Sequence, residues 1–316
     1  MLVTEADFER QVARAKALSP DPRVGLFGPD SIVWRVARES ILFLGAGRAA
    51  LMQLAHPYVA HAIEQHSATR TDPIGRFNRT FQNVYGMIFG DLAFALESAR
   101  RVRRVHDRVH GTIGEDVGRF AKGHRYRAND AEALYWVHAT LLETAVLVFE
   151  IAHGPMRPED RDAYVRDLVR FAWLFGVPDE IIPTDWRSFE SHVESAVASD
   201  TIAVGRPARE IGQYLLTPPP SLVFGPAVRA FRSVTAGLLP PTLRDQFGLS
   251  WARSDQLAYT ASLKAVRASY RLLPLRLRCV PDYIEATRRL AGKPSPDKTG
   301  RALQSALLRH LRPPAD

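Results

Sequence analysis

The chain of 316 residues contains a single cysteine, Cys279. One thiol excludes an internal disulfide framework, a cysteine-ligated zinc site and an iron–sulfur cluster, and it is typical of proteins from a reducing compartment. The haem-attachment motif Cys-x-x-Cys-His is also absent, so any haem would be held without thioether links. Because the N-terminal residues do not form a secretory signal, we expect a cytoplasmic protein.

The sequence also lacks the motifs of several common enzyme classes. It has no Gly-x-Gly-x-x-Gly after a strand, no phosphate-binding Gly-Lys-Ser/Thr loop and no Gly-x-Ser-x-Gly elbow. The Asp-Asp-x-x-Asp cluster with which all-α isoprenoid enzymes hold magnesium is missing as well. A functional site of another kind is therefore expected.

Long uncharged apolar runs are scarce. The apolar segment from Glu39 to Ala55 is shorter than the ~20 residues needed to cross a bilayer, and Arg48 lies near its middle. A buried core helix explains this segment better, with Gly45 and Gly47 permitting close packing of another helix. We therefore expect no stable membrane insertion.

The charge balance is positive but carries no clear signature of a nucleic-acid partner. The formal net charge is +8, with 46% hydrophobic and 24% charged residues, which is ordinary for a soluble globular protein. Most of the basic residues are arginines, and they are spread along the chain instead of forming a tail. Since no recognition motif accompanies the charge, we expect no nucleic-acid binding. A helical nucleic-acid-binding regulator is kept as a minor alternative.

Helical patterns fill most of the chain, and period-two strand patterns are rare. Thr4 is expected to begin the first helix. A segment from Asn129 or Asp130 to Ala152 is apolar on most sides, as in the central helix of a bundle. Residues 112–129 are interpreted as a connecting loop. Further helices are expected at 158–176, 184–198, 206–216, 226–237, 255–273, 281–291 and 300–311.

These patterns predict an all-α fold. We expect one large domain over residues 1–316, with ten or more helices around the central buried helix. No internal repeat of fixed period is evident.

The strongest chemical candidate is the segment 73–111, in which Gly90-Asp91 separates two helical runs. The first run carries Arg76, Arg79 and Thr80 at positions i, i+3 and i+4, so these three residues share one helix face. Cationic and hydroxyl groups set among apolar residues are costly to bury unpaired, so this face is better explained as part of a ligand site than as part of the core.

The second run carries five arginines among valines, with His106 and His110 one helical turn apart. Together the two runs would suit a flat, hydrophobic, anionic ligand that also needs a nitrogen donor, and haem has these properties. A solvated surface is the alternative interpretation of the arginine face.

Other histidines are less convincing as metal ligands. His61, Glu64 and His66 do not lie on one helix face, so capping or core histidines explain them better. The motif Glu150-x-x-His153 occurs without the second copy and the further carboxylates that a ferritin-like di-metal site needs. We expect these groups to be structural.

Five motifs occur in the order and spacing of one known family. They are Arg48-Ala-Ala-Leu-Met-Gln53-Leu-Ala-His56-Pro57, Arg76-x-x-Arg79-Thr80, Phe89-Gly90, His106-x-x-Val109-x-Gly111 and Tyr135-Trp136-Val137-His138-Ala139-Thr140. In these segments the chain resembles the MpaB family, which includes the rubber oxygenases known as latex-clearing proteins. The resemblance covers about residues 35–150, and residues 151–316 match only as further helices.

The resemblance implies an all-α fold around a non-covalent haem b with a proximal histidine. The histidine that opens the family's His-x-x-Val segment falls on His106, which is expected to ligate the iron. His110 is the competing ligand, with His56 and His138 next in line, and His138 is also a candidate for the cofactor pocket.

The family's Arg-x-x-Lys-Thr segment lies near the haem and falls on Arg76, Arg79 and Thr80, the expected catalytic residues. Arg76 and Arg79 are also expected to pair with the haem propionates or to polarise bound oxygen.

One position departs from the family pattern. Rubber oxygenases can carry an iron-ligating lysine where this chain has Arg79, and arginine stays protonated, so rubber cleavage is not transferred. Our first hypothesis is a haem-dependent oxygenase or related oxidoreductase that uses dioxygen or peroxide on a small apolar or aromatic metabolite. A haem-binding or sensing protein without turnover is the main alternative.

Overall fold

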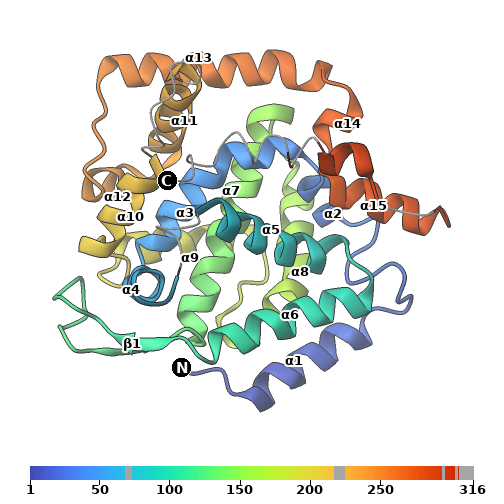
Figure 1. Cartoon of the computed structure of the whole chain (residues 1–316), viewed down its shortest axis with the longest axis horizontal. Coiled ribbons are helices and arrows are strands. Elements are labelled where there is room, and N and C mark those ends of the chain that lie inside the picture. Colours follow the sequence, from blue (N-terminus) through green and yellow to red (C-terminus); the bar gives the residue numbers. More distant parts are fainter. Residues whose placement is uncertain (68–72, 217–224, 294–295, 303–304, 306–316) are drawn as a thin grey trace.

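The structure, a computed structural model, describes residues 1–67, 73–216, 225–293, 296–302 and 305 (Figure 1). The elements with defined bounds are α1 (Glu5–Ala17), α2 (Ile32–Ala37), η1 (Ser40–Gly45), α3 (Ala46–Leu54), α4 (Pro57–His66), α5 (Pro73–Phe89), α6 (Leu92–His106), β1 (His110–Thr112), β2 (Arg125–Arg127), α7 (Ala131–His153), α8 (Pro158–Trp173), η2 (Asp179–Ile181), α9 (Trp186–Ala198), α10 (Arg206–Leu216), α11 (Gly225–Leu238), α12 (Pro241–Gln246), α13 (Arg253–Ser269), η3 (Tyr270–Leu272), α14 (Leu275–Arg278) and α15 (Pro281–Leu290). Within the described ranges the strands amount to one two-stranded hairpin. The predicted all-α fold is confirmed.

Polar side chains determine where several helices begin. Thr4 caps α1, Asp91 caps α6 and Asp130 caps α7, each by accepting a hydrogen bond from a backbone N–H of the first turn. Those N–H groups have no partner inside the helix, so a cap stabilises the helix end. The predicted beginnings at Thr4 and at residues 129–130 are confirmed, whereas the helix expected at 184–198 begins at Trp186 and is capped by Asp185.

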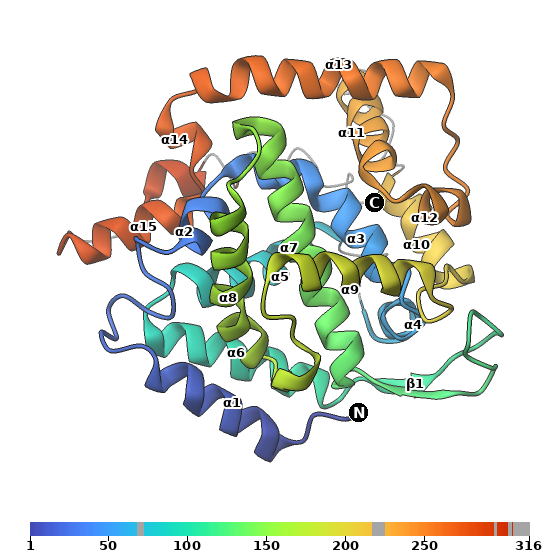
Figure 2. The ribbon, with the colours of Figure 1, turned by 180° about the vertical axis from the view of Figure 1, so that it is seen from behind.

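The central element is α7, which passes through the middle of the molecule in both views (Figures 1 and 2). It packs against η1 and α3, which precede it in the chain, and against α9 and α13, which follow it. Among the described residues, α7 is the one helix that is long and apolar enough to cross a membrane, and most of it is buried inside the molecule. This burial is what the sequence predicts for the core helix of a bundle.

The segment predicted as one helix from Glu39 to Ala55 forms two elements, the 3-10 helix η1 and the α-helix α3. Close packing explains the small residues at the junction. A Cβ atom on Gly45 would lie 2.4 Å from the methyl group of Thr144 on α7, and one on Gly47 would lie 2.2 Å from Oγ1 of Thr235 on α11. The predicted role of these glycines in close packing is confirmed.

Arg48 ties three helices together inside the core. Its side chain is buried, and it donates hydrogen bonds to Thr144 Oγ1 (2.6 Å), Glu143 Oε2 (2.9 Å) and the Leu238 carbonyl (2.7 Å). A buried guanidinium is tolerated because each of its three nitrogen atoms donates a hydrogen bond to an oxygen atom of α7 or α11. Arg48 therefore positions α3 against the central helix.

The segment predicted as a loop at residues 112–129 is more ordered than expected. β1 and β2 pair antiparallel, with His110 opposite Arg127 and Thr112 opposite Arg125. Tyr126, between the two arginines, is buried in a small separate apolar cluster with Ile113 and two other side chains of this segment. The hairpin extends outward from the helical body beside α4 (Figure 1).

Candidate functional site

The predicted helix hairpin of residues 73–111 is formed by α5 and α6, which pack antiparallel with the turn at Gly90 and Asp91. Two contacts between α5 and α6 fix the register of the two helices. Oδ1 of Asn83 accepts a hydrogen bond of 3.2 Å from Arg101. One turn closer to the connection, Gly86 faces Ser98, since a Cβ atom on Gly86 would lie 3.0 Å from Ser98 Oγ.

This register places the expected site residues at one end of the hairpin. Asn83 and Arg101 are opposite each other, so the preceding turn of α5, with Arg79 and Thr80, lies opposite the last turn of α6. That turn ends at His106. The hairpin thus brings Arg79, Thr80 and His106 to its open end.

His106 has the properties of a nitrogen donor. Its side chain is partly buried, and desolvation, with a smaller contribution from Arg103, lowers its pKa to about 4, so the imidazole is neutral at pH 7. Neither ring nitrogen has a hydrogen-bond partner among the described residues. A neutral imidazole with a lone pair available is the form that binds a metal ion.

His110 does not lie one helical turn after His106, and that prediction is wrong. α6 ends at His106, and the chain turns so that His110 begins β1, opposite Arg127. Pairing with β2 satisfies backbone groups that a longer helix would have satisfied internally. The side chain of His110 is exposed on the hairpin, and its carbonyl accepts a hydrogen bond of 2.9 Å from His66 Nε2.

On α5, the structure places Arg79 and Thr80 with exposed side chains. The Arg79 carbonyl accepts a hydrogen bond of 3.1 Å from Asn83 Nδ2, as expected within a regular helix. The Arg76 side chain lies outside the described part of the structure. Since residues 73–89 are helical, the three expected site residues do share one face of α5.

Three arginines of α6 form ion pairs, and the side chains of Arg100 and Arg104 are exposed whereas that of Arg103 is largely buried. The pairs are Arg100–Glu9, Arg103–Asp107 and Arg104–Glu97, at 3.0, 2.8 and 2.7 Å. Arg100 joins α6 to α1, and the other two stay within or next to their own helix. These contacts support the solvated-surface interpretation for this part of the arginine face.

His138 is buried on α7, in contact with aromatic rings. Its ring stacks on Phe171 of α8, with centroids 5.5 Å apart, and lies 5.6 Å from the ring of Tyr135. Desolvation lowers its pKa to about 3, and Nδ1 has no hydrogen-bond partner. These contacts face α8, and none of them involves the α5–α6 hairpin.

In the described ranges, no group of three or more His, Cys, Asp or Glu side chains is arranged to hold a metal ion. His61 is buried, with Glu64 and Glu115 at 3.5 and 3.8 Å from its two ring nitrogens. A haem iron needs fewer ligands from the protein, because the porphyrin supplies four nitrogen ligands and the protein adds one or two. A single neutral imidazole such as that of His106 is sufficient.

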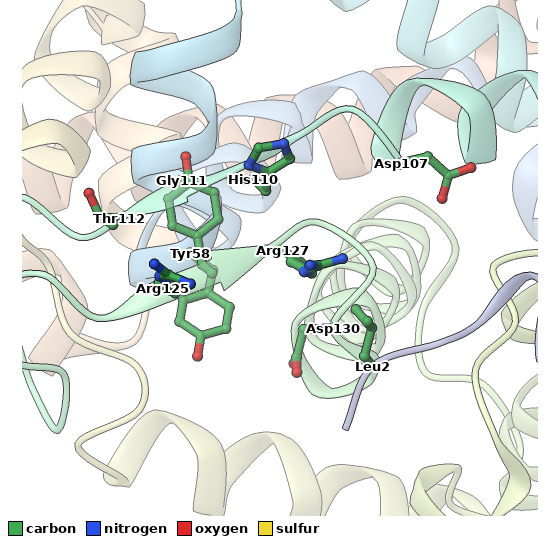
Figure 3. A pocket seen from close by; sticks show the side chains of 10 residues that line it. Leu2, Tyr58, Asp107, His110, Gly111, Thr112, Arg125, Arg127 and Asp130 are labelled. Atoms are coloured by element: carbon green, nitrogen blue, oxygen red, sulfur yellow. The ribbon is translucent and has the colours of Figure 1, made fainter.

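A groove of about 820 Å³ begins where α6 ends (Figure 3). Its lining residues are Leu2, Tyr58, Asp107, His110, Gly111, Thr112, Arg125, Tyr126, Arg127 and Asp130. Arg125 and Arg127 have exposed side chains without an ion pair among the described residues, and they lie on the same hairpin face as His110. This combination of unpaired arginines and tyrosine rings is suited to binding an anionic group.

Sequence reasoning missed Tyr58, Arg125 and Arg127 as groove residues. The available signal was the alternation Arg125-Tyr126-Arg127, a short period-two pattern with an apolar residue between two charges. Three residues are too few to distinguish a strand from a loop by periodicity.

A model of a known family matches most of the chain. The family model described as ER-bound oxygenase mpaB/B′/Rubber oxygenase, catalytic domain, matches residues 34–268. No curated protein and no solved structure matches the chain at a significant level. The matched range begins within α2, contains the α5–α6 hairpin and the central helix, and ends within α13.

Proposed function

Because this chain belongs to the family of ER-bound MpaB/B′ oxygenases and rubber oxygenases, we propose that it is a haem-b-dependent oxygenase acting on a small apolar or aromatic molecule. Membership of an oxygenase family implies an enzyme that uses dioxygen and an organic substrate. The haem proposal rests mainly on the state and position of His106. Its imidazole is neutral, has no hydrogen bond to the described residues and lies at the open end of the hairpin.

His106 would hold the haem iron as the proximal ligand, and Arg76 and Arg79 would pair with the propionates. When bound, the haem would supply activation of dioxygen or peroxide. Arg79 cannot release its proton at working pH, so it would act as a fixed positive charge that stabilises an anionic group. The hydroxyl of Thr80, on the same helix face, would donate a hydrogen bond to a polar atom of the oxidant or substrate.

The substrate class follows from the same residues. Arg79 stands at the position where rubber oxygenases can carry an iron-ligating lysine. Rubber is therefore not the proposed substrate. With one cysteine, which is buried, and an expected cytoplasmic location, a small metabolite is the proposed substrate.

An absorption spectrum of protein produced with a supply of haem tests the cofactor. We expect a Soret band, about one haem b per chain by pyridine haemochrome assay, and complete extraction of the pigment into acid acetone. Protein that stays colourless after haem titration would refute the proposal. Haem binding without substrate-dependent consumption of dioxygen or peroxide would support a haem-binding or sensing protein in place of an oxygenase.

A further inference from the structure

The segment from α13 to α14, residues 253–278, forms an outer arm of the molecule. α13 lies along the edge of the molecule in both views (Figures 1 and 2), and none of its 17 residues is buried. It packs on α11 and α7 through half-buried side chains such as Tyr259. The opposite face of α13 has no partner among the described residues.

Exposed leucines are concentrated on this arm. The described part of the chain has eleven exposed large apolar residues, and five of them lie here. They are Leu257, Leu272, Leu273, Leu275 and Leu277. Leu272 is 82% exposed and Leu275 is 64% exposed, so most of the surface of each residue is in contact with solvent. Single exposed leucines are normal on protein surfaces, whereas a group of this kind marks an interaction surface.

Apart from Asp255 in the first turn of α13, all charged residues of the arm are positive. Residues 256–281 contain Lys264, Arg267, Arg271, Arg276 and Arg278 and no Asp or Glu. Arg278 is directed inward, 3.5 Å from the buried carboxylate of Glu39. The other four have exposed side chains and form no ion pair with the described residues.

Exposed leucines and cations occur together along the outer face of α13 and the turn that follows it. Leu257, Ala261 and Lys264 follow each other at helical spacing on the exposed face, and Arg271 precedes the leucines of the turn. Long basic side chains can reach past apolar neighbours to a polar layer. This arrangement is typical of segments that lie in the interface of a bilayer with anionic lipids.

We propose that residues 253–278 attach the protein to the surface of a membrane that contains anionic lipids. The leucines enter the boundary between headgroups and acyl chains, and Lys264, Arg267, Arg271 and Arg276 bind the anionic headgroups. Attachment is peripheral, because the arm lies on the surface and its helices do not span the bilayer. The proposal goes beyond the oxygenase function and does not depend on haem.

A second copy of the chain is a poorer occupant of this surface. A two-fold interface would place the same arm of each protomer against the other. The four unpaired cations would then face four more, with one acidic residue in each arm, Asp255, to offset them. An anionic lipid surface complements both the leucines and the charge.

Flotation of the full chain with lipid vesicles tests the proposal. We expect binding to vesicles that contain phosphatidylglycerol, weaker binding to pure phosphatidylcholine, and release at high salt because the contacts of cations with headgroups are screened. The double variant Leu272→Ser/Leu275→Ser should lower the partition coefficient about tenfold or more. Arg271→Gln/Arg276→Gln should lower it about tenfold on anionic vesicles only.

Matched controls use similar side chains elsewhere on the surface. The controls are Leu18→Ser, at a leucine that is 55% exposed at the end of α1, and Arg187→Gln, at an exposed arginine of α9. Both variants should bind vesicles like the unchanged protein. Failure to bind anionic vesicles, or equal effects of the arm and control variants, would overturn the proposal. A dimer in solution that the leucine changes dissociate would instead assign the arm to contact between copies.

Discussion

Oδ1 of Asn83 on α5 accepts a hydrogen bond of 3.2 Å from Nη1 of Arg101 on α6. This bond sets the register of the two antiparallel helices, and the contact between Gly86 and Ser98 agrees with it. The register brings residues that are far apart in the sequence, Arg79 and His106, to the same end of the hairpin. The predictions about haem depend on this arrangement.

His106→Ala should abolish stable haem binding or strongly shift the Soret band, because it removes the neutral imidazole of the expected iron ligand. His110→Ala is the matched control, since that side chain is exposed on β1 and should leave haem content unchanged. Absorption spectra and haem-to-protein ratios of both variants provide the measurement. Recovery of the spectrum of His106→Gly by added imidazole would identify the ligand directly. If His110→Ala has the larger effect, the assignment of the proximal ligand is wrong.

The unchanged ferric protein should be largely high-spin, because Arg79 cannot supply a lone pair to a sixth iron site. Arg79→Lys should introduce a low-spin component that grows with rising pH as the lysine loses its proton. Arg79→Gln, which removes the charge without adding a ligand, should stay high-spin. Electron paramagnetic resonance spectra distinguish these states. A low-spin signal that dominates in the unchanged protein and persists in Arg79→Gln would show that another side chain closes the site.

His56 should make the protein less stable as the pH falls. Its Nδ1 accepts a hydrogen bond of 3.2 Å from the backbone of Tyr58 and so caps α4, and burial lowers its pKa from 6.5 to about 4. Below pH 6.5 the unfolded chain protonates this histidine while the folded chain does not. Stability is therefore full above pH 6.5 and falls towards pH 4, by about 2 kcal/mol at pH 5 for this group.

Urea unfolding at pH 7 and pH 5 measures this effect in the variant His56→Asn. Asparagine is a good helix cap that does not titrate, so the variant should lose about 2 kcal/mol less than the unchanged protein between the two pH values. His124→Asn changes an exposed histidine of the neighbouring hairpin and serves as the control. Equal pH dependence in all three proteins would contradict the role of His56.

Arg48→Met should destabilise the fold by about 3 kcal/mol. The change leaves the Leu238 carbonyl and the Thr144 hydroxyl without the donor that they share in the core. Arg104→Met, which removes an exposed ion pair with Glu97, should cost far less, because solvent screens pairs of exposed charges. The midpoints of urea unfolding compare the two variants. A loss from Arg48→Met no greater than that from Arg104→Met would show that Arg48 is not a structural tie.

Local signals in the sequence predicted most of the helices. Caps such as Thr4 and Asp130 act within one turn, and the apolar faces of α5 and α7 repeat along a single element, so both are visible in a short window of sequence. The helix pair and its turn at Gly90-Asp91 follow from the same local rules.

Features that depend on distant residues were not predictable in this way. Val105 and Val109 continue a helical pattern past His106, yet the chain leaves the helix there because β1 pairs with β2. Likewise η1 is a 3-10 helix where Gly45 meets Thr144 of α7, a contact that the local pattern does not contain.

The burial of α7 has a consequence for how the protein is made. Two of its partners, η1 and α3, precede it in the chain, but α9, α13 and η3 are synthesised after it. A helix with enough apolar length to enter a bilayer therefore emerges from the ribosome before the chain that covers it. During that interval the nascent chain exposes a long apolar segment, and exposed apolar surface of this kind is prone to aggregation until the C-terminal helices cover it.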